Sequence, residues 1–122
     1  MKEFTFDSAH RLPDYKGPCH NVHGHTYKLQ VGLRGEVDYT TGMVIDFAII
    51  KKIIKSEVVD KLDHVMLNDV TDVDFPHYMP TAELMVLWIR DRLMVALSAH
   101  VKVTEVRLWE TPTSYAEWRT WL

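Results

Sequence analysis

Three histidines stand in two stretches of alternating sequence, at spacings that suit a metal ion. A single glycine separates His23 from His25, and His10 ends an alternating stretch that begins at Phe4. Side chains two residues apart on a β-strand project from the same face, so His23 and His25 present two imidazoles side by side. Three neutral imidazoles from two adjacent strands can leave the fourth position of a tetrahedral zinc ion open, as catalytic zinc sites do. The sequence therefore predicts a zinc site at His10, His23 and His25.

The only cysteine, Cys19, lies four residues before His23. A thiol close to a cation ionises more readily, and the thiolate can act as a base or a nucleophile. The spacing Cys-x-x-x-His-Gly-His would also suit a closed structural zinc site with Cys19 as the fourth ligand, and this alternative stays open. A single cysteine forms no intrachain disulfide, and the sequence shows neither a secretory apolar segment nor an apolar run of about 18 residues. We therefore expect a reducing, cytoplasmic setting without membrane insertion.

Further polar positions suit proton transfer or ligand binding. In the pair Asp63 and His64, the carboxylate can orient a proton-transfer histidine, although a polar helix terminus explains the pair as well. Glu110 shares a strand face with apolar residues. There it would either bind a guanidine-like edge of a ligand in bidentate fashion or reach solvent past the strand end. Thr81 and Glu83 open a helix, and capping explains both without a ligand.

Strands and helices must position these groups. Alternation with a period of two predicts strands over about 4–10, 23–34, 102–110 and 115–121, with a short strand at 43–45. Asp46 and Thr81 are the expected N-caps of two helices. Their apolar stripes are Phe47, Ile50, Ile54, Val58 and Leu62 in the first helix and Ala82, Val86, Ile89, Leu93 and Leu97 in the second. The order predicts an α+β fold, a four-stranded antiparallel sheet with two helices on one face.

The length and composition of the chain are those of one globular domain over residues 1–122. Apolar residues make up 47% and charged residues 25%, which is typical of a soluble protein. The formal net charge of −3 carries no basic signature, so a nucleic-acid partner is not expected. A core this small, together with a second sheet face and edges that need covering, predicts a homo-oligomer.

Several short motifs together resemble one known family. In chain order they are Phe6-Asp7-Ser8-Ala9-His10, Cys19-x-x-x-His23-Gly24-His25, Leu62-Asp63-His64, Pro80-Thr81-Ala82-Glu83 and Trp109-Glu110-Thr111. They resemble the 6-pyruvoyl-tetrahydropterin synthase and 6-carboxy-tetrahydropterin synthase family, over nearly the whole chain. The three residues between Cys19 and His23 are similar to the bacterial 6-carboxy enzymes of the queuosine pathway, whereas the pyruvoyl enzymes of animals have a longer spacer.

The resemblance implies the tunnelling fold, in which subunits form an oligomeric, multistranded barrel and trimers pair into hexamers. It also implies three kinds of functional residue, which are the zinc ligands His10, His23 and His25, the catalytic base Cys19, and the proton-relay pair Asp63 and His64. The relay pair would reach the site from a neighbouring subunit. Glu110 would anchor the aminopyrimidine edge of a pterin, and Thr81 would make a further pterin contact.

The implied activity is a zinc-dependent lyase reaction in queuosine and 7-deazapurine biosynthesis. It converts 7,8-dihydroneopterin triphosphate to 6-carboxy-5,6,7,8-tetrahydropterin, acetaldehyde and triphosphate. One alternative is a pyruvoyl-type synthase, which eliminates triphosphate without losing two carbons. Another is a non-catalytic, zinc-stabilised pterin-binding module. A hydrolase using Cys19 as nucleophile with His64 leaves the other histidines unexplained. Candidates for gripping the triphosphate rest on proximity in sequence alone and are Arg11, Lys16 and Lys28.

Overall fold

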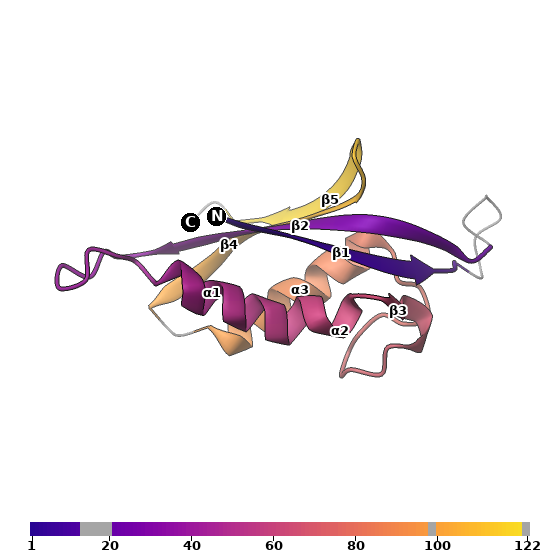
Figure 1. Ribbon diagram of the computed structural model, residues 1–122, viewed down its shortest axis with the longest axis horizontal. Coiled ribbons are helices and arrows are strands. Elements are labelled where there is room, and N and C mark those ends of the chain that lie inside the picture. The colour runs from indigo at the N-terminus through magenta and orange to yellow at the C-terminus, as the bar shows by residue number, and fades with distance from the viewer. Residues whose placement is uncertain (13–20, 98–99, 121–122) are drawn as a thin grey trace.

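The computed structural model describes residues 1–12, 21–97 and 100–120. Its elements in chain order are β1 (Lys2–His10), β2 (His23–Gly35), α1 (Phe47–Ile54), α2 (Asp60–Leu62), β3 (Val65–Met66), α3 (Ala82–Ala96), β4 (Val101–Thr111) and β5 (Ser114–Arg119). A π-helical segment, Lys55–Val59, joins α1 to α2, and a short 3-10 helix, Leu67–Asp69, follows β3. The strands form one sheet, and the helices lie on one of its faces (Figure 1). The α+β architecture with its helices on one face is therefore confirmed.

The sheet has five strands in the order β3-β1-β2-β4-β5. The pairs β1–β2, β2–β4 and β4–β5 are antiparallel, as predicted. However, β3 runs parallel to β1, with Ser8 opposite Val65 and Ala9 opposite Met66. The prediction of a four-stranded, wholly antiparallel sheet is thus wrong, because the sheet has a fifth, parallel strand, β3, at one edge. β3 has two residues and follows a polar helix end, so it is too short for an alternating pattern to reveal it.

The segment between β2 and α1 forms a local hairpin. Asp38 and Met43 make an isolated antiparallel bridge, so the strand predicted at 43–45 does not join the sheet. The hairpin turns at Gly42, whose φ of 75° is easily adopted only by glycine. Its apolar residues are largely exposed, so this segment has no buried face that would pack it against the sheet.

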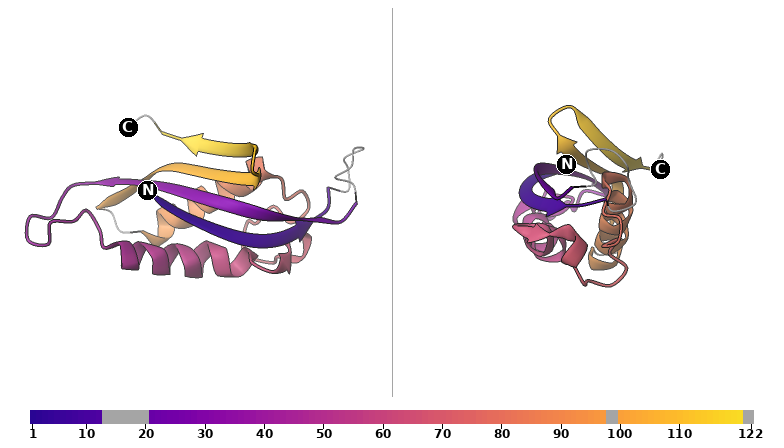
Figure 2. Two further views of the ribbon diagram at one scale, coloured as in Figure 1. Left: turned by 45° about the horizontal axis from the view of Figure 1, so that its top comes forward. Right: turned by 90° about the vertical axis from the view of Figure 1, so that its right-hand side faces the viewer.

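The hydrophobic core lies between the sheet and the helices (Figure 2). Residues buried on the strand side include Phe6, Tyr27, Leu29, Val31, Val106 and Leu108. The predicted stripe of α3 is buried throughout, and so is that of the first helix except Phe47, which is 65% exposed at the start of α1. The inward face of β1 and β2 is therefore apolar along most of its length, and the histidines stand at its end.

Both predicted helix caps are present. Asp46 Oδ1 accepts a hydrogen bond from the Ala48 amide at 2.8 Å, and Thr81 Oγ1 accepts one from the Leu84 amide at 3.2 Å. These bonds satisfy amides that the first helical turn leaves without partners. Thr81 thereby determines where α3 begins, and so where the residue before it, Pro80, presents its carbonyl.

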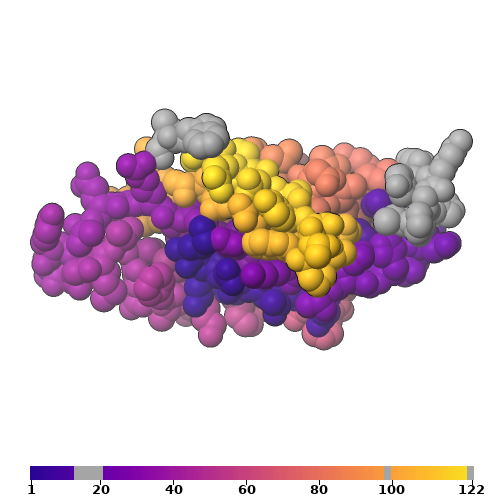
Figure 3. All heavy atoms as spheres, turned by 90° about the horizontal axis from the view of Figure 1, so that it is seen from above, coloured from indigo at the N-terminus to yellow at the C-terminus, as the bar shows by residue number. Residues whose placement is uncertain are grey.

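The other face of the sheet carries no helix in the described part of the chain. Figure 3 shows that side, where β5, in yellow, lies at the edge of the sheet next to β4. Lys28 lies 4.6 Å from the ring centre of Trp109, and Arg107 binds Glu117 at 2.6 Å. Cations and aromatic rings therefore occupy this face instead of an apolar layer. None of the helices in the described ranges has the length and apolar character that crossing a membrane requires.

Candidate functional site

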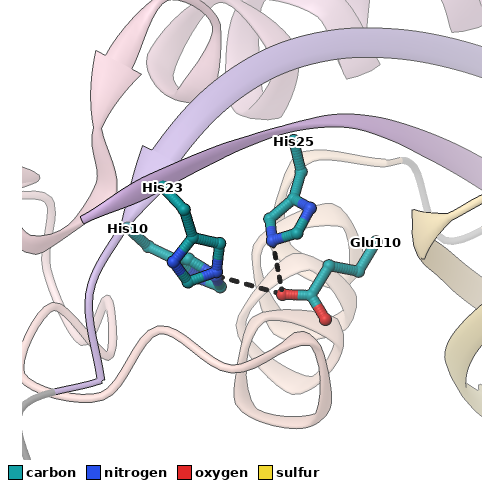
Figure 4. A group of neighbouring side chains, drawn as sticks. All are labelled: His10, His23, His25 and Glu110. Atoms are coloured by element: carbon teal, nitrogen blue, oxygen red, sulfur yellow. Dashed lines mark hydrogen bonds and ion pairs between the residues drawn. The ribbon is translucent and has the colours of Figure 1, made fainter. Parts of the chain in front are cut away.

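Strand pairing brings the three histidines together. In the antiparallel register of β1 and β2, His10 lies opposite His23 and Ser8 lies opposite His25. Alternation turns all three imidazoles toward the helix-covered face, where His10 is fully buried. Glu110, near the end of β4, adds a carboxylate from the other side of β2. Figure 4 shows the four side chains converging.

The ligand atoms of this group are close to one another. His10 Nε2 lies 3.1 Å from His23 Nε2. Glu110 Oε1 lies 3.1 Å from His10 Nε2 and 3.4 Å from His25 Nε2 (Figure 4). One such atom from each of the four residues falls within 4.8 Å of every other. We call His10, His23, His25 and Glu110 the metal centre.

Backbone carbonyls orient two of the imidazoles. His10 Nδ1 donates to the Pro80 carbonyl at 2.9 Å, and His23 Nδ1 donates to the Asn21 carbonyl at 2.8 Å. Because a carbonyl only accepts, the Nδ1 atoms carry the protons, and in a neutral ring Nε2 then holds a lone pair. Two lone pairs facing each other at 3.1 Å repel, so the pair needs a cation or a proton beside it. Carbonyls that hold ligating histidines in this way are typical of metal sites.

His25 also carries a ring nitrogen that a cation would stabilise. Its Nε2 is buried and has no hydrogen-bond partner among the described residues. The Glu110 carboxylate approaches it to 3.4 Å, which is an ion-pair distance without hydrogen-bond geometry. A buried polar atom left in this state costs about 1–3 kcal/mol unless something binds it. A metal ion coordinated by this nitrogen would remove that cost.

The group fits zinc. With zinc–nitrogen distances of about 2.0–2.1 Å, neighbouring ligand atoms of a tetrahedral site lie about 3.3 Å apart. Three of the six separations at the metal centre are 3.1, 3.1 and 3.4 Å, and the others are at most 4.8 Å. Imidazole nitrogens and a carboxylate oxygen are also ligands that zinc takes readily. Both the donor set and its spacing therefore suit this ion.

The charge distribution of the metal centre is that of a cation site. Burial lowers the pKa of His10, but the hydrogen bond with Glu110 and the Pro80 carbonyl outweigh burial and raise it. Burial dominates at His25, and its pKa is lowered. The hydrogen bond from His10 holds the pKa of Glu110 below its ordinary value, against the effect of burial. The groups that favour a proton on His10 are thus the groups that would favour a metal ion at the same place.

Asp63 and His64 form a second group, which does not join the metal centre within the chain. His64 Nδ1 lies 2.9 Å from Asp63 Oδ1, and Asp63 Oδ1 accepts the Asp7 amide at 3.0 Å. The His64 amide donates to the Asp7 carbonyl at 2.6 Å. His64 has a φ of 58°, a region that few residues other than glycine adopt. Hydrogen bonds from β1 therefore hold His64 in an uncommon conformation.

The surroundings of this pair lie on the helix-free side of the sheet. Asp7 Oδ1 accepts a hydrogen bond from Thr26 Oγ1 at 2.5 Å, and both residues point away from the core. A depression of about 540 Å³ is lined there by Gly24, Thr26 and His64, among others. The amide of Asp7 and then His64 lower the pKa of Asp63, so its carboxylate stays ionised and orients the imidazole.

The structure places none of three further predicted residues, Cys19, Lys16 and Thr81, at the metal centre. Cys19 and Lys16 lie outside the described residues. Thr81 acts as a helix cap, and the neighbouring Pro80 carbonyl binds His10. Its predicted pterin contact remains a prediction.

Sequence reasoning missed two residues beside these groups. The buried Ser8 hydroxyl donates to the Leu62 carbonyl, directly before Asp63. Tyr27 Oη lies 3.3 Å from His10 Nδ1. Both residues share the inward alternating face with the histidines, which is the signal that could have found them.

Comparison with known proteins agrees with this fold and site. Residues 1–120 match the family described as 6-pyruvoyl tetrahydropterin synthase. The chain belongs to this family. A Haemophilus influenzae protein named 6-carboxy-5,6,7,8-tetrahydropterin synthase is 37% identical to it over 138 residues, covering 97% of this chain and 96% of that protein.

Relatives with other names are nearly as similar. The structure of Caenorhabditis elegans 6-pyruvoyl tetrahydropterin synthase superposes with a TM-score of 0.83 at 32% identity, covering 98% of this chain and 92% of that one. A Pyrococcus furiosus protein named dihydroneopterin monophosphate aldolase is 36% identical over 108 residues, covering 87% of this chain and 83% of that protein. Overall similarity therefore identifies the family more sharply than the individual reaction.

Proposed function

We propose that this chain is a zinc-dependent 6-carboxy-tetrahydropterin synthase, a carbon–carbon lyase. One observation carries the proposal: His10, His23 and His25 bring one ligand atom each within 4.8 Å of one another, and two of these atoms, His10 Nε2 and His23 Nε2, lie 3.1 Å apart. The most similar of the relatives described above bears the corresponding name and matches nearly the full length of both chains. The three-residue spacer between Cys19 and His23 supports the same choice within the family.

The proposed substrate is 7,8-dihydroneopterin triphosphate. Triphosphate leaves the third side-chain carbon, and the bond between the first and second carbons breaks with uptake of one water. The first carbon becomes the carboxylate of 6-carboxy-5,6,7,8-tetrahydropterin, and the other two leave as acetaldehyde. The side chain loses two electrons overall, and these reduce the C6=N5 bond of the dihydropterin ring to give the tetrahydropterin. Bound zinc would supply Lewis-acid chemistry, which makes protons on the side chain easier to remove.

Residues of the chain would carry out the proton transfers and bind the pterin ring. Cys19 would accept a proton from the side chain as its thiolate, a role that rests on sequence. The Asp63–His64 pair would pass protons to and from the substrate, with the ionised Asp63 holding Nδ1 of the ring. Glu110 would accept two parallel N–H donors from the aminopyrimidine edge. Thr81 would contribute a further pterin contact.

Assembly would complete the site. Asp63 and His64 form a group separate from the metal centre of their own chain, and this supports a site to which a neighbouring subunit brings them. We therefore propose a homo-oligomer, a hexamer of two trimers built on the tunnelling fold. Its setting would be the cytoplasm and the queuosine and 7-deazapurine pathway, without a nucleic-acid or membrane partner.

Product analysis tests the proposal. The zinc-loaded protein is incubated with 7,8-dihydroneopterin triphosphate, and products are identified by mass spectrometry. We expect 6-carboxy-tetrahydropterin and acetaldehyde. Cys19→Ala should abolish turnover and keep its zinc, whereas loss of zinc from this variant would make Cys19 a ligand and refute its role as base.

A pyruvoyl-type synthase is the second candidate, favoured by the likeness to the Caenorhabditis elegans enzyme structure. It would release triphosphate and keep all three side-chain carbons, so the same experiment separates the two. Absence of any turnover, with pterin still bound, would favour a zinc-stabilised binding module.

A further inference from the structure

Helix α3 carries apolar side chains on two of its sides. One side packs against the sheet at β4 and β5 and closes the core (Figure 1). A second series consists of Leu84, Leu87, Trp88 and Val95, at the spacing i, i+3, i+4 and i+11, which also follows one helix face. Leu87 is 40% exposed and Val95 is 88% exposed. The described residues therefore leave much of this second series, the outer stripe, uncovered.

The loop before α3 forms the other wall of a groove along the outer stripe. Trp88 Nε1 donates to the Val73 carbonyl at 3.0 Å, and Phe75 packs edge-to-face on Trp88 with ring centres 5.0 Å apart. These contacts fix the loop against the helix, so the groove is preformed. Its volume is about 570 Å³, and its apolar lining includes Val73, Pro76, Tyr78, Leu84, Leu87 and Val95.

The charged residues that line the groove are mostly acidic. They are Glu57, Asp74, Asp91 and Arg92. The single cation, Arg92, is already engaged by carboxylates, because its Nε lies 3.3 Å from Glu57 Oε2 and its Nη2 lies 3.7 Å from Asp72 Oδ2. Its guanidinium also lies over the Trp88 ring, 5.4 Å from the ring centre. Arg92 therefore offers little to an anionic ligand.

Two carboxylates at the groove keep charge that faces solvent. Asp91 binds Arg90 at 2.8 Å, yet its side chain is still 65% exposed. Asp74 is exposed and takes part in no ion pair within the described parts of the chain. An acidic partner would be repelled here, and a wholly apolar partner would take these carboxylates out of water without a counterion. The groove therefore favours a partner that is both apolar and basic.

We propose that this groove binds a basic amphipathic helix of a partner protein. Leu84 and Val95 stand 11 positions apart, which is about 16 Å or three helical turns, so a helix of that length can lie along the outer stripe. Its apolar residues enter between the loop and α3, as in other helix-in-groove complexes. Its lysines or arginines flank that apolar face and meet Asp74 and Asp91. No residue of the groove belongs to the metal centre or to the Asp63–His64 pair, so the inference is independent of the proposed function.

An amphipathic peptide of leucine and lysine is the probe for this surface. It carries a fluorescein label and is about 14 residues long, or about four helical turns. The control peptide has glutamate in place of every lysine. Fluorescence anisotropy with the full chain should show the lysine peptide binding at least about tenfold more tightly than the glutamate peptide, because like charges facing each other are costly. Added salt should weaken the binding of the lysine peptide.

A lysine placed in the groove should repel the lysine peptide. Val95→Lys introduces this charge into the lining, whereas Met94→Lys introduces it at the next residue of α3, which is 48% exposed and does not line the groove. We expect at least about tenfold weaker binding by Val95→Lys and a change within about twofold for Met94→Lys. Thermal unfolding should show both variants as stable as the parent, because both side chains are exposed.

Removing one carboxylate isolates the contribution of charge. Asp74 has a φ of 62°, which asparagine also adopts readily, so Asp74→Asn keeps the backbone of the loop. Binding of the lysine peptide should weaken about 2–5-fold, as for an exposed ion pair. Asp69→Asn is the matched control, because it removes the same charge from an exposed residue outside the groove, and its binding should equal that of the parent.

Four results would overturn the inference. The parent could fail to bind the lysine peptide, which would leave the groove without this function. Equal binding of both peptides, or unchanged binding by Asp74→Asn, would refute the choice of a basic partner. Equal weakening by Val95→Lys and Met94→Lys would locate the peptide elsewhere on the surface.

Discussion

Replacing Ser8 with alanine should destabilise the protein and disturb the Asp63–His64 pair together. The Ser8 hydroxyl is buried and donates to the Leu62 carbonyl, one of the acceptors that a helix end leaves without a partner. Leu62 immediately precedes Asp63. The Asp63 carboxylate accepts a hydrogen bond from the Asp7 amide, and the His64 amide donates one to the Asp7 carbonyl. Ser8→Ala therefore removes one of the bonds that join this segment to the sheet.

The expected magnitude follows from the buried carbonyl. Leaving a buried acceptor unsatisfied costs about 1–3 kcal/mol of the free energy of unfolding. For a chain of 122 residues, an unfolding entropy of about 2.1 cal/mol/K per residue converts each kcal/mol into about 4 °C of Tm. Ser8→Ala should thus lower Tm by about 4–12 °C.

Thermal unfolding followed by circular dichroism at one protein concentration measures this shift. Ser56→Ala is the control, since the exposed Ser56 hydroxyl donates to Ile53 and its loss should cost within about 0.5 kcal/mol. Turnover of Ser8→Ala well below its melting range should also fall, because His64 loses part of its support. A Ser8→Ala variant as stable and active as Ser56→Ala would refute the reasoning.

Three further predictions follow from the two groups. His23→Ala should bind less than one zinc per chain, measured by elemental analysis of the dialysed protein, and full zinc content would exclude His23 as a ligand. Zinc affinity should fall as pH falls from about 8 to 6, because protons compete for the imidazoles and the raised pKa of His10 starts that competition at higher pH; an affinity independent of pH would contradict this. Asp63→Asn should lower Tm at neutral pH. The pKa of Asp63 is lowered in the folded protein, so its stabilisation is present above the unfolded pKa and lost as pH falls through the folded one. The two melting curves should therefore converge in acid, and a constant difference would count against the pair.

Local chemistry in the sequence determined much of the fold and the centre of the site. Alternation placed His23 and His25 on one strand face, because successive side chains of a strand must point to opposite sides. Asp46 and Thr81 marked the starts of both helices, because only side chains of this kind satisfy the first amides. Such features depend on a few neighbouring residues and can be derived without any knowledge of the rest of the chain.

Contacts between distant segments were decided by the tertiary structure alone. β3 pairs with β1 only because the chain returns beside β1 after the helix. A strand of two residues is too short to show an alternating pattern in the sequence. The Pro80 carbonyl orients His10 across 70 positions of sequence. The Glu110 carboxylate meets the histidines because β4 pairs with β2 on the side of that strand away from β1. Periodicity shows which face a side chain takes, whereas the packing of the whole chain determines what that side chain meets there.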